Sequence, residues 1–436
     1  MTKPQGVIQF VLLLGVLCSP AWMLAGSSPQ SSAPAQKSDL VSQLWGERVE
    51  PILLRPVNSP AQAYQDAEML MVPMHAAFKR NNLQWEQDFA QHFQRTLQNS
   101  SALPDQSLSR TFYLYFASQF LVLASSTGHA DLIPKGLPDF VFSDLEAYWL
   151  RRPAIHYEHP AFTGMKARVL WKLNTRKVAK SYYRAIIDDE LFAFSIAADL
   201  RTYSYHDTAE RQRAWRLPLD DVISVADKVY EQEGTRTSSG GWLLQPGVWS
   251  DHPDFQYAGN LRAESGMRPK TVQGIGWDSS HFMRAPLLLT SLMNSFGVGS
   301  RQYNYYLDLR KALATQFFAN VLAEPSRDSP CYRQKNFMDG SNGVYRWGYG
   351  NLGVGNGYGP YGVSGVLLIG WWAFLDTDQS RALYRDLAKQ YPWPKECIAL
   401  YLPPRPASQP YTDKDLDPNS PAMRQYHLLV LLASEL

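Results

Sequence analysis

Apolar residues recur along most of this chain at the three- and four-residue spacing of helices that bury one face or more. Few stretches alternate with the period of two that marks a half-buried strand, so the pattern predicts an all-α protein. Ser59-Pro60 is a typical helix start, and Gly128 is a typical stop. Helices are predicted at 60–80, 83–97, 106–126, 143–149, 160–173, 180–203, 219–232, 278–296, 301–322, 360–375, 378–390 and 421–435.

These helices belong to one domain, predicted to span residues 39–436, because no second linker interrupts the pattern. Long and short connections alternate between roughly a dozen helices without a sharp sequence repeat. This arrangement predicts an (α/α) toroid of helical hairpins, with a helical solenoid as the competing architecture. The non-repetitive loops favour the toroid.

Two long segments break the helical pattern. Residues 235–276 are rich in Gly, Pro and aromatic residues, and residues 328–365 contain the glycine-rich stretch GSNGVYRWGYGNLGVGNGYGPYGVSG. Loops of this length inside a domain are usually functional or disordered. The density of Tyr and Trp in both argues against disorder, so we expect them to wall a binding cleft.

The amino terminus predicts export. Lys3 precedes an apolar run from Val7 to Leu17, and small residues follow near Ala25 and Gly26, which is the order of a secretory signal peptide over residues 1–26. An uncleaved N-terminal anchor is the alternative. Residues 27–38 are Ser, Pro, Ala and Gln with almost nothing to bury, and are predicted to be a disordered linker. We therefore expect a periplasmic or secreted protein with no stable membrane span after signal removal.

Charge and composition narrow the partner. Lys and Arg number 42 against 40 Asp and Glu, and no basic stripe is visible, so we expect no nucleic-acid partner. The 13 Trp and 24 Tyr residues include candidates for stacking on the flat apolar faces of sugars, although a large helical core also buries many aromatic residues. A polysaccharide or oligosaccharide is therefore the expected partner.

Two cysteines remain after signal removal, Cys331 and Cys397. An even, sparse count in an exported protein fits one structural disulfide, which would close a loop of about 65 residues. Neither cysteine has a second Cys or a His at ligand spacing, and His156 and His159 with Glu158 lack a further ligand nearby. We expect no metal site and no cofactor.

The segment GWDSSHFMRAPLLLTSL, which begins at Gly276, is the strongest candidate for chemistry. Asp278 or Ser279 stands at the N-cap of an apolar helix, so His281 and Arg284 fall in its first two turns. Asp278, His281 and Arg284 are spaced i, i+3 and i+6 and share roughly one helical face. They follow a long aromatic loop, a position that favours a cleft. A structural alternative is a capping Asp, a hydrogen-bonded His and an ion-paired Arg.

Two acidic segments add candidates. Asp251, His252 and Asp254 lie between aromatic residues and could supply acid–base groups or an ordinary turn. The run 188–190 (DDE) lies in an apolar helix and spreads over too wide an arc for all three carboxylates to face water. One or two of them would face inward with a raised pKa, whereas the simpler interpretation is outer-face acids or ion pairs with Arg184.

The order WDSSHF, then DGSNGVYRWGY, then YGPYGVSGVLLIGWWAFL resembles the toroidal polysaccharide lyases of the alginate-lyase and heparinase-lyase kind. The resemblance covers about 100 residues. It implies that His281, Arg346 and Tyr349 match the lyase His, Arg and Tyr. Ser280 stands where those lyases carry an Asn that neutralises the substrate carboxylate.

The resemblance implies a polysaccharide lyase that abstracts a sugar C5 proton next to a uronate. His281 or an ionised Tyr349 would be the base, and Arg346 or Arg284 would stabilise the developing charge. One alternative is a glycoside hydrolase that pairs Asp278 with a carboxylate among Asp188, Asp189, Asp251 and Asp254. The other is a non-catalytic glycan-binding or assembly protein. In each case the expected walls of the cleft are Trp249, Trp277, Trp347 and Tyr349.

Overall fold

The computed structural model describes residues 34–100, 103, 107–157, 159–349, 352, 355–405 and 409–436. It is mostly helical, with 59% helix and 6% strand, which confirms the predicted helical class. The expected signal peptide, 1–26, and residues 27–33 of the expected linker lie outside the described residues, whereas residues 34–38 form the start of α1 (Pro34–Arg48).

The more deeply buried elements alternate along the chain with elements that bury one face only. The deeply buried set consists of α3 (Pro60–Lys79), α5 (Ser107–Ser126), α8 (Asp188–Ser204), α11 (Ala285–Asn294), the 3-10 turns η6 (Ser364–Ile369) and η7 (Trp371–Leu375), and α15 (Pro421–Ala433). The peripheral set is α1, α4 (Leu83–Gln98), α6 (Leu137–Leu150), α9 (Ala209–Glu233), α12 (Arg301–Gln316) and α13 (Asp378–Lys389). Helices α3, α5, α8 and α11 contact one another in that order, α11 contacts η7, and α15 contacts both η6 and α3.

Shorter elements connect these helices. The short helices and turns are α2 (Glu50–Leu54), α7 (Gly164–Asn174), α10 (Ser279–Phe282), α14 (Lys395–Tyr401), η2 (Ala130–Leu132), η3 (Ser181–Arg184), η4 (Pro253–Phe255) and η5 (Phe317–Val321). The strands form three antiparallel pairs: β1 (Pro153–His156) with β2 (His159–Thr163), β3 (Gly234–Arg236) with β4 (Trp242–Leu244), and β5 (Leu322–Ala323) with β6 (Arg333–Gln334). In register, Gly234 faces Leu244 and Leu322 faces Gln334.

Several predicted helices differ from those observed. Residues 360–375 form 3-10 turns interrupted at Gly370, whose φ of 94° lies in the left-handed region. The helix expected over 180–203 begins only at Asp188, because residues 181–184 form the separate turn η3. The helix expected over 278–296 is split into α10 and α11. Pro286 in the first turn of α11 lacks the N–H that a continuous helix would need there.

A cluster of buried polar side chains lies between the central helices, and we call it the axial cluster. The carboxylate of Asp199 on α8 accepts hydrogen bonds from Ser118 Oγ (2.7 Å) and Gln119 Nε2 (2.8 Å) on α5. Gln119 also contacts Ser291 on α11 and His75 on α3. Burial raises the pKa of Asp199 to about 7, although these hydrogen bonds oppose the shift. The cluster therefore links α3, α5, α8 and α11 through hydrogen bonds between buried polar side chains.

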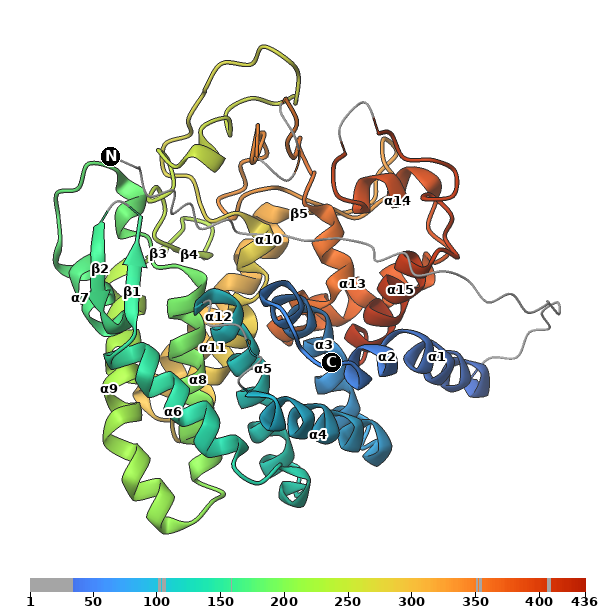
Figure 1. Ribbon diagram of the computed structural model, residues 1–436. Coiled ribbons are helices and arrows are strands. Elements are labelled where there is room, and N and C mark those ends of the chain that lie inside the picture. The colour runs from blue at the N-terminus through green and yellow to red at the C-terminus, as the bar shows by residue number, and fades with distance from the viewer. Residues whose placement is uncertain are drawn as a thin grey trace.

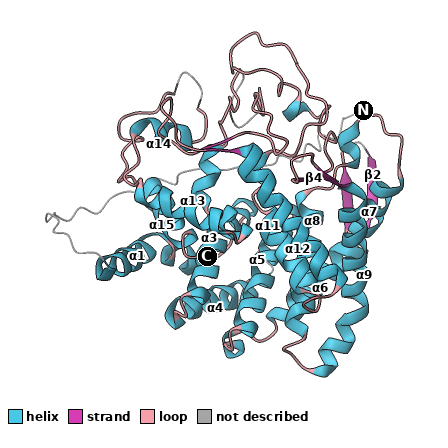
Figure 2. Cartoon of the chain, turned by 180° about the vertical axis from the view of Figure 1, so that it is seen from behind, coloured by secondary structure: helices cyan, strands magenta, loops and turns pink. Residues whose placement is uncertain are grey.

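The two long loops lie at one end of the helices. Figure 1 shows the connections of residues 235–276 and 325–365 gathered above the helices, and the reverse view in Figure 2 shows the same arrangement. Cys331 and Cys397 form the predicted disulfide, with a Cα–Cα distance of 5.4 Å, and it ties the second loop to α14. None of the helices in the described ranges combines the length and the apolar composition needed to cross a membrane.

Candidate functional site

A cavity of about 40 Å³ lies between the two loops and the start of α8 and α10. We call it the candidate cavity. It is lined by Tyr157, Ile187, Asp188, Trp249, His252, Asp254, Phe255, Trp277, Asp278, His281, Tyr345 and Arg346. Most of the residues singled out in the sequence are therefore brought together, although they span nearly 100 positions.

The two loops are joined directly beside the candidate cavity. The backbone N–H of Arg346 donates to the Asp254 carbonyl (2.9 Å), and that of Val344 donates to the Asn260 carbonyl (2.9 Å). Gly343, which immediately precedes Val344, approaches the first loop so closely that a Cβ there would lie 1.7 Å from the Ala258 carbonyl oxygen. Glycine is required at this position, and the glycine-rich stretch serves here to dock one loop on the other.

Asp278 and His281 form a buried pair. Asp278 is the N-cap of α10, as predicted, and its Oδ1 accepts from the His281 backbone N–H (3.0 Å), from the Ser280 hydroxyl and from His281 Nδ1 (2.7 Å). Burial would raise the pKa of Asp278, but His281 and Arg346 reverse the shift and hold it below its ordinary value. The carboxylate thus stays ionised and fixes the imidazole, as in many enzymes that use His as a general base.

Arg346 supplies a cation to the same cavity. Its Nε donates to Asp254 Oδ2 (3.0 Å), and its guanidinium lies 4.6 Å from the ring of Tyr349. Burial would lower the pKa of Arg346, but the neighbouring Tyr345, Asp254 and Asp278 raise it, so it remains charged. Its backbone φ of 54° is unusual for a residue other than glycine, and such strain concentrates at functional sites.

Three buried donors on the cavity walls lack a hydrogen-bond partner among the described residues. They are Arg346 NH1 and the indole nitrogens of Trp249 and Trp277. A buried donor without an acceptor costs about 1–3 kcal/mol, so such groups in a native protein need an explanation. A ligand with oxygen acceptors would satisfy them. The site is thus suited to a carboxylate or a polyhydroxylated molecule.

Trp249 and Trp277 form a packed wall and do not form an open platform. Their ring centroids are 5.2 Å apart in an edge-to-face arrangement, and Trp249 also stacks on Phe255 at 5.5 Å. Both indoles are more than nine-tenths buried. Stacking of a sugar flat on either ring would therefore require movement, whereas contact with the indole edges would not.

Helix α8 contributes one carboxylate to the candidate cavity, that of Asp188. It lies at the first position of α8, and its Oδ2 is 3.2 Å from NH1 of Arg284. Burial raises the pKa of Asp188, with Asp278 adding to the shift and Arg284 opposing it. Arg284 itself was predicted to face the cleft, and this prediction is wrong for the observed side chain, which is fully buried beneath it. The guanidinium donates to Glu68 (2.8 Å) and to Tyr64, because the break before α11 turns it toward α3.

The other acids of the 188–190 run have structural partners. Asp189 and Glu190 pair with Arg168 at 3.0 and 2.7 Å, and Glu190 also pairs with Lys172. All these side chains are buried, so the expectation of outer-face acids, or of pairs with Arg184, is wrong. These pairs depend on tertiary contacts, because α7 places Arg168 and Lys172 next to the first turn of α8.

Besides Arg284, three further predicted site residues lie outside the candidate cavity. The carboxylate of Asp251 accepts from Ser181 N (2.9 Å) and Ser181 Oγ (2.5 Å) and lines a separate groove. Tyr349 contacts Arg346 but does not line the cavity, and Trp347 is partly exposed near Tyr257. The side chains of His156, Glu158 and His159 lie outside the described part of the structure.

Sequence reasoning did not assign Tyr157 and Tyr345 to the site. Tyr157 adopts a φ of 37° between β1 and β2 and packs against His252. Tyr345 faces Tyr358 in an isolated β-bridge, and burial raises its pKa well above the ordinary value. Their positions depend on long-range packing, and the only sequence signal was the aromatic content of the loops.

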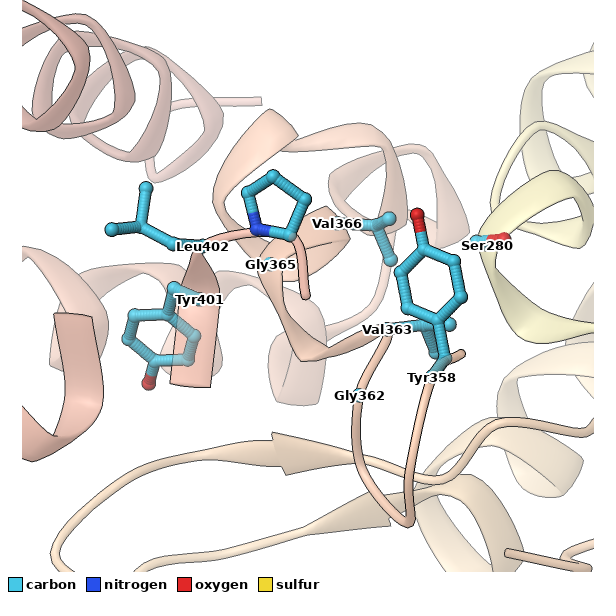
Figure 3. Close-up of a pocket in the computed structure, with 9 residues that line it drawn as sticks. Ser280, Tyr358, Gly362, Val363, Gly365, Val366, Tyr401 and Leu402 are labelled. Atoms are coloured by element: carbon cyan, nitrogen blue, oxygen red, sulfur yellow. The ribbon is translucent and has the colours of Figure 1, made fainter. Parts of the chain in front are cut away.

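A second, smaller cavity of about 10 Å³ lies beyond Ser280 (Figure 3). Tyr358, Val363, Val366 and Leu402 border it, and its surface is mostly apolar. Figure 3 shows the Tyr358 ring next to Val363 and Val366, with Ser280 behind. Its lining residues in the described part of the chain include no carboxylate, imidazole or cation, so this cavity does not share the chemistry of the candidate cavity.

No protein-family model, curated protein or solved structure matches the chain. Across the described ranges, no group of three or more His, Cys, Asp and Glu side chains is arranged to hold a metal ion.

Proposed function

We propose that this protein is an exported polysaccharide lyase that cleaves an acidic polysaccharide by abstracting a proton next to a uronate. One observation carries the proposal: the Asp278–His281 pair and the charged Arg346 line a single cavity. A base and a cation on the same cavity are the two groups that such an elimination requires.

His281 is the base that the geometry favours. Its Nδ1 bonds to a carboxylate whose lowered pKa keeps it ionised, and the ring lies on the cavity wall. The alternative base, ionised Tyr349, is disfavoured because burial raises its pKa even though Arg346 opposes the shift. Tyr349 also does not line the cavity.

Arg346 is the group that would neutralise the uronate. Its Nε is engaged by Asp254, whereas its NH1 has no hydrogen-bond partner in the described structure. A carboxylate or its enolate-like transition state would accept from NH1 and from the indole N–H groups of Trp249 and Trp277. These donors would neutralise the substrate carboxylate, which is the role of the Asn that the lyases carry where this chain has Ser280.

In the proposed reaction the C5 proton passes to His281 and the C4–O bond breaks. The electron pair of the C5–H bond forms a C4=C5 double bond, and the C4–O pair leaves with the glycosidic oxygen. That oxygen takes a proton from water, and His281 returns its own proton to the solvent, so that the enzyme is regenerated. The products are an unsaturated sugar and a new reducing end.

We also propose that the helical hairpins form a closed toroid and that the protein is exported. The alternation of deeply buried and peripheral elements, with α15 returning to contact α3, supports a closed ring of hairpins. The signal-like sequence over residues 1–26 supports a periplasmic or secreted location.

A glycoside hydrolase is the second candidate, favoured by one observation. Asp188, with its raised pKa, could act as an acid while Asp254, on the same cavity, acts as the base. Asp188 forms an ion pair with Arg284, which weakens this alternative, because an adjacent cation favours the ionised form of an acid.

Product analysis tests the proposal. The purified protein is incubated with a panel of uronate-containing polysaccharides, and double bonds are counted by ultraviolet absorbance against new reducing ends. We expect about one double bond for each new end. Reducing ends without double bonds would indicate the hydrolase, and the absence of both products on every substrate would contradict the enzymatic proposal.

A further inference from the structure

A large groove lies next to the candidate cavity, on the other side of the turn at 247–254. Its volume is about 730 Å³, and the segment 176–184 forms one bank while residues 245–251 form the other. We call it the polar groove. It lies at the end of α9 that leads into the first loop, and the 235–276 loop rises from that end in Figure 1.

A thin wall separates the two spaces. Ser181 donates to Asp251 on the groove side, and the neighbouring Tyr182 packs on His252 with ring centroids 4.7 Å apart. His252 lines the candidate cavity, as does Tyr157, whose ring lies 4.8 Å from Tyr182. A polysaccharide chain that extends from the candidate cavity past Tyr182 and His252 would therefore enter the polar groove.

The acidic groups of the groove already have partners. Glu233 accepts from Arg184 at 3.0 Å and from Gln245 at 3.1 Å. The backbone N–H groups of Ser181 and Tyr182 and the hydroxyl of Ser181 donate to Asp251, and these bonds lower its pKa although burial opposes them. The negative charge of the groove is thus largely compensated within its own walls.

Two cations of the groove remain available. Arg176 and Lys177 are exposed, and no ion pair engages either one within the described residues. The groove therefore presents net positive charge to a ligand, next to a cavity whose Arg346 also lacks an acceptor for NH1. Flexible exposed cations of this kind suit repeated anionic groups on a polymer.

We infer that the polar groove is a second subsite, which binds an anionic sugar of the same polysaccharide through Arg176 and Lys177. The inference rests on the proposed function for the identity of the polymer. The ligand chemistry is a carboxylate or a sulfate ester carried on a glycan, because either group pairs with exposed Arg and Lys.

Binding, measured without cleavage, tests the inference. Full-length protein carrying His281→Ala is titrated with alginate, polygalacturonate and hyaluronate as carboxylated polymers, with dextran sulfate as the sulfated polymer, and with uncharged dextran. We expect binding to at least one charged polymer that weakens with salt. Adding Arg176→Gln and Lys177→Gln should reduce the affinity about three- to tenfold, which is the scale of two exposed ion pairs.

The matched control is Arg213→Gln with Arg216→Gln. These two exposed residues lie near the start of α9, and removing them changes the net charge by the same amount. The inference is overturned if no charged polymer binds, if the groove variant binds like the parent, or if the control loses as much affinity. Variant-dependent binding by a protein that yields no unsaturated product would leave the subsite in place and remove the proposed lyase reaction.

Discussion

Two buried polar clusters of this protein share similar residues and differ in their surroundings. In the axial cluster, Asp199 is held by neutral donors, and burial raises its pKa to about 7. On the candidate cavity, Asp278 is equally buried, yet His281 and Arg346 hold its pKa below the ordinary value against the effect of burial. The carboxyl group of Asp199 is therefore about half protonated at pH 7, whereas that of Asp278 is ionised.

The difference teaches how to separate structural from functional polar groups in a helical core. The polar groups that meet at Asp199 bond to one another across α3, α5, α8 and α11. The cavity cluster instead leaves donors of Arg346, Trp249 and Trp277 unpaired next to empty space. Unmet hydrogen-bonding capacity beside a cavity, more than burial of charge, marks the candidate site.

The largest effect that sharpens this comparison is expected at Arg346. Arg346→Gln removes the cation and its unpaired donor, so kcat/KM on the cleaved polysaccharide should fall about 10²- to 10³-fold. Arg310→Gln is the control, because Arg310 bonds to Thr290 away from the cavity. Steady-state kinetics of folded variants, checked by circular dichroism, measure the effect. Equal activity in the two variants would contradict the proposed role of Arg346.

A smaller effect, on stability, is expected in the axial cluster. The pKa of Asp199 is raised from 3.8 in the unfolded chain to about 7 in the fold, so the folded state holds the proton more tightly. Its contribution to the free energy of unfolding is therefore greatest below the unfolded pKa and declines as the pH rises toward 7. Asp199→Asn removes this decline.

Urea unfolding at pH 5 and pH 8 measures it. Relative to the wild type, Asp199→Asn should gain about 2–3 kcal/mol of unfolding free energy between these two pH values, and the cleavage activity should be unchanged. An equal difference at both pH values would show that Asp199 is not held protonated in the fold. Loss of activity would show that the axial cluster also serves the site.

Local rules were sufficient to predict the helical class but not every helix. The periodicity and caps indicate helices, and the residues around Asp278 leave Asp278 and Ser279 as the two N-cap candidates, of which Asp278 is the observed one. The Cys331–Cys397 bond followed from cysteine count alone. The 3-10 turns at 364–375 were missed, because their apolar sequence fits an α-helix and only packing and Gly370 interrupt it.

The sequence predicts many residues of the candidate site but not the contacts between them. His281, Trp249 and Trp277 were singled out from their positions and residue types, Arg346 was singled out from the resemblance to the polysaccharide lyases, and all four line one cavity. The direction of Arg284 and the pairing of Asp189 with Arg168 depend on contacts between distant elements, which sequence spacing does not encode.

One relation changes how the function is tested. The sequence alone assigns Asp278 to the hydrolase alternative and His281 to the lyase, which predicts that Asp278→Asn spares a lyase. Because Asp278 Oδ1 lies 2.7 Å from His281 Nδ1, that substitution would disturb the imidazole as well. Replacement of His281 is the more direct test of the base.

The central claim is that His281 removes a proton at the candidate cavity. The measurement is the initial rate of unsaturated-product formation, by ultraviolet absorbance, for the wild type, for His281→Ala and for His75→Ala as a buried control on the axial cluster. We predict that His281→Ala loses activity about 10²- to 10⁴-fold, the range for a general base, while folded His75→Ala retains it. Unsaturated product formed at the wild-type rate by His281→Ala would contradict the account.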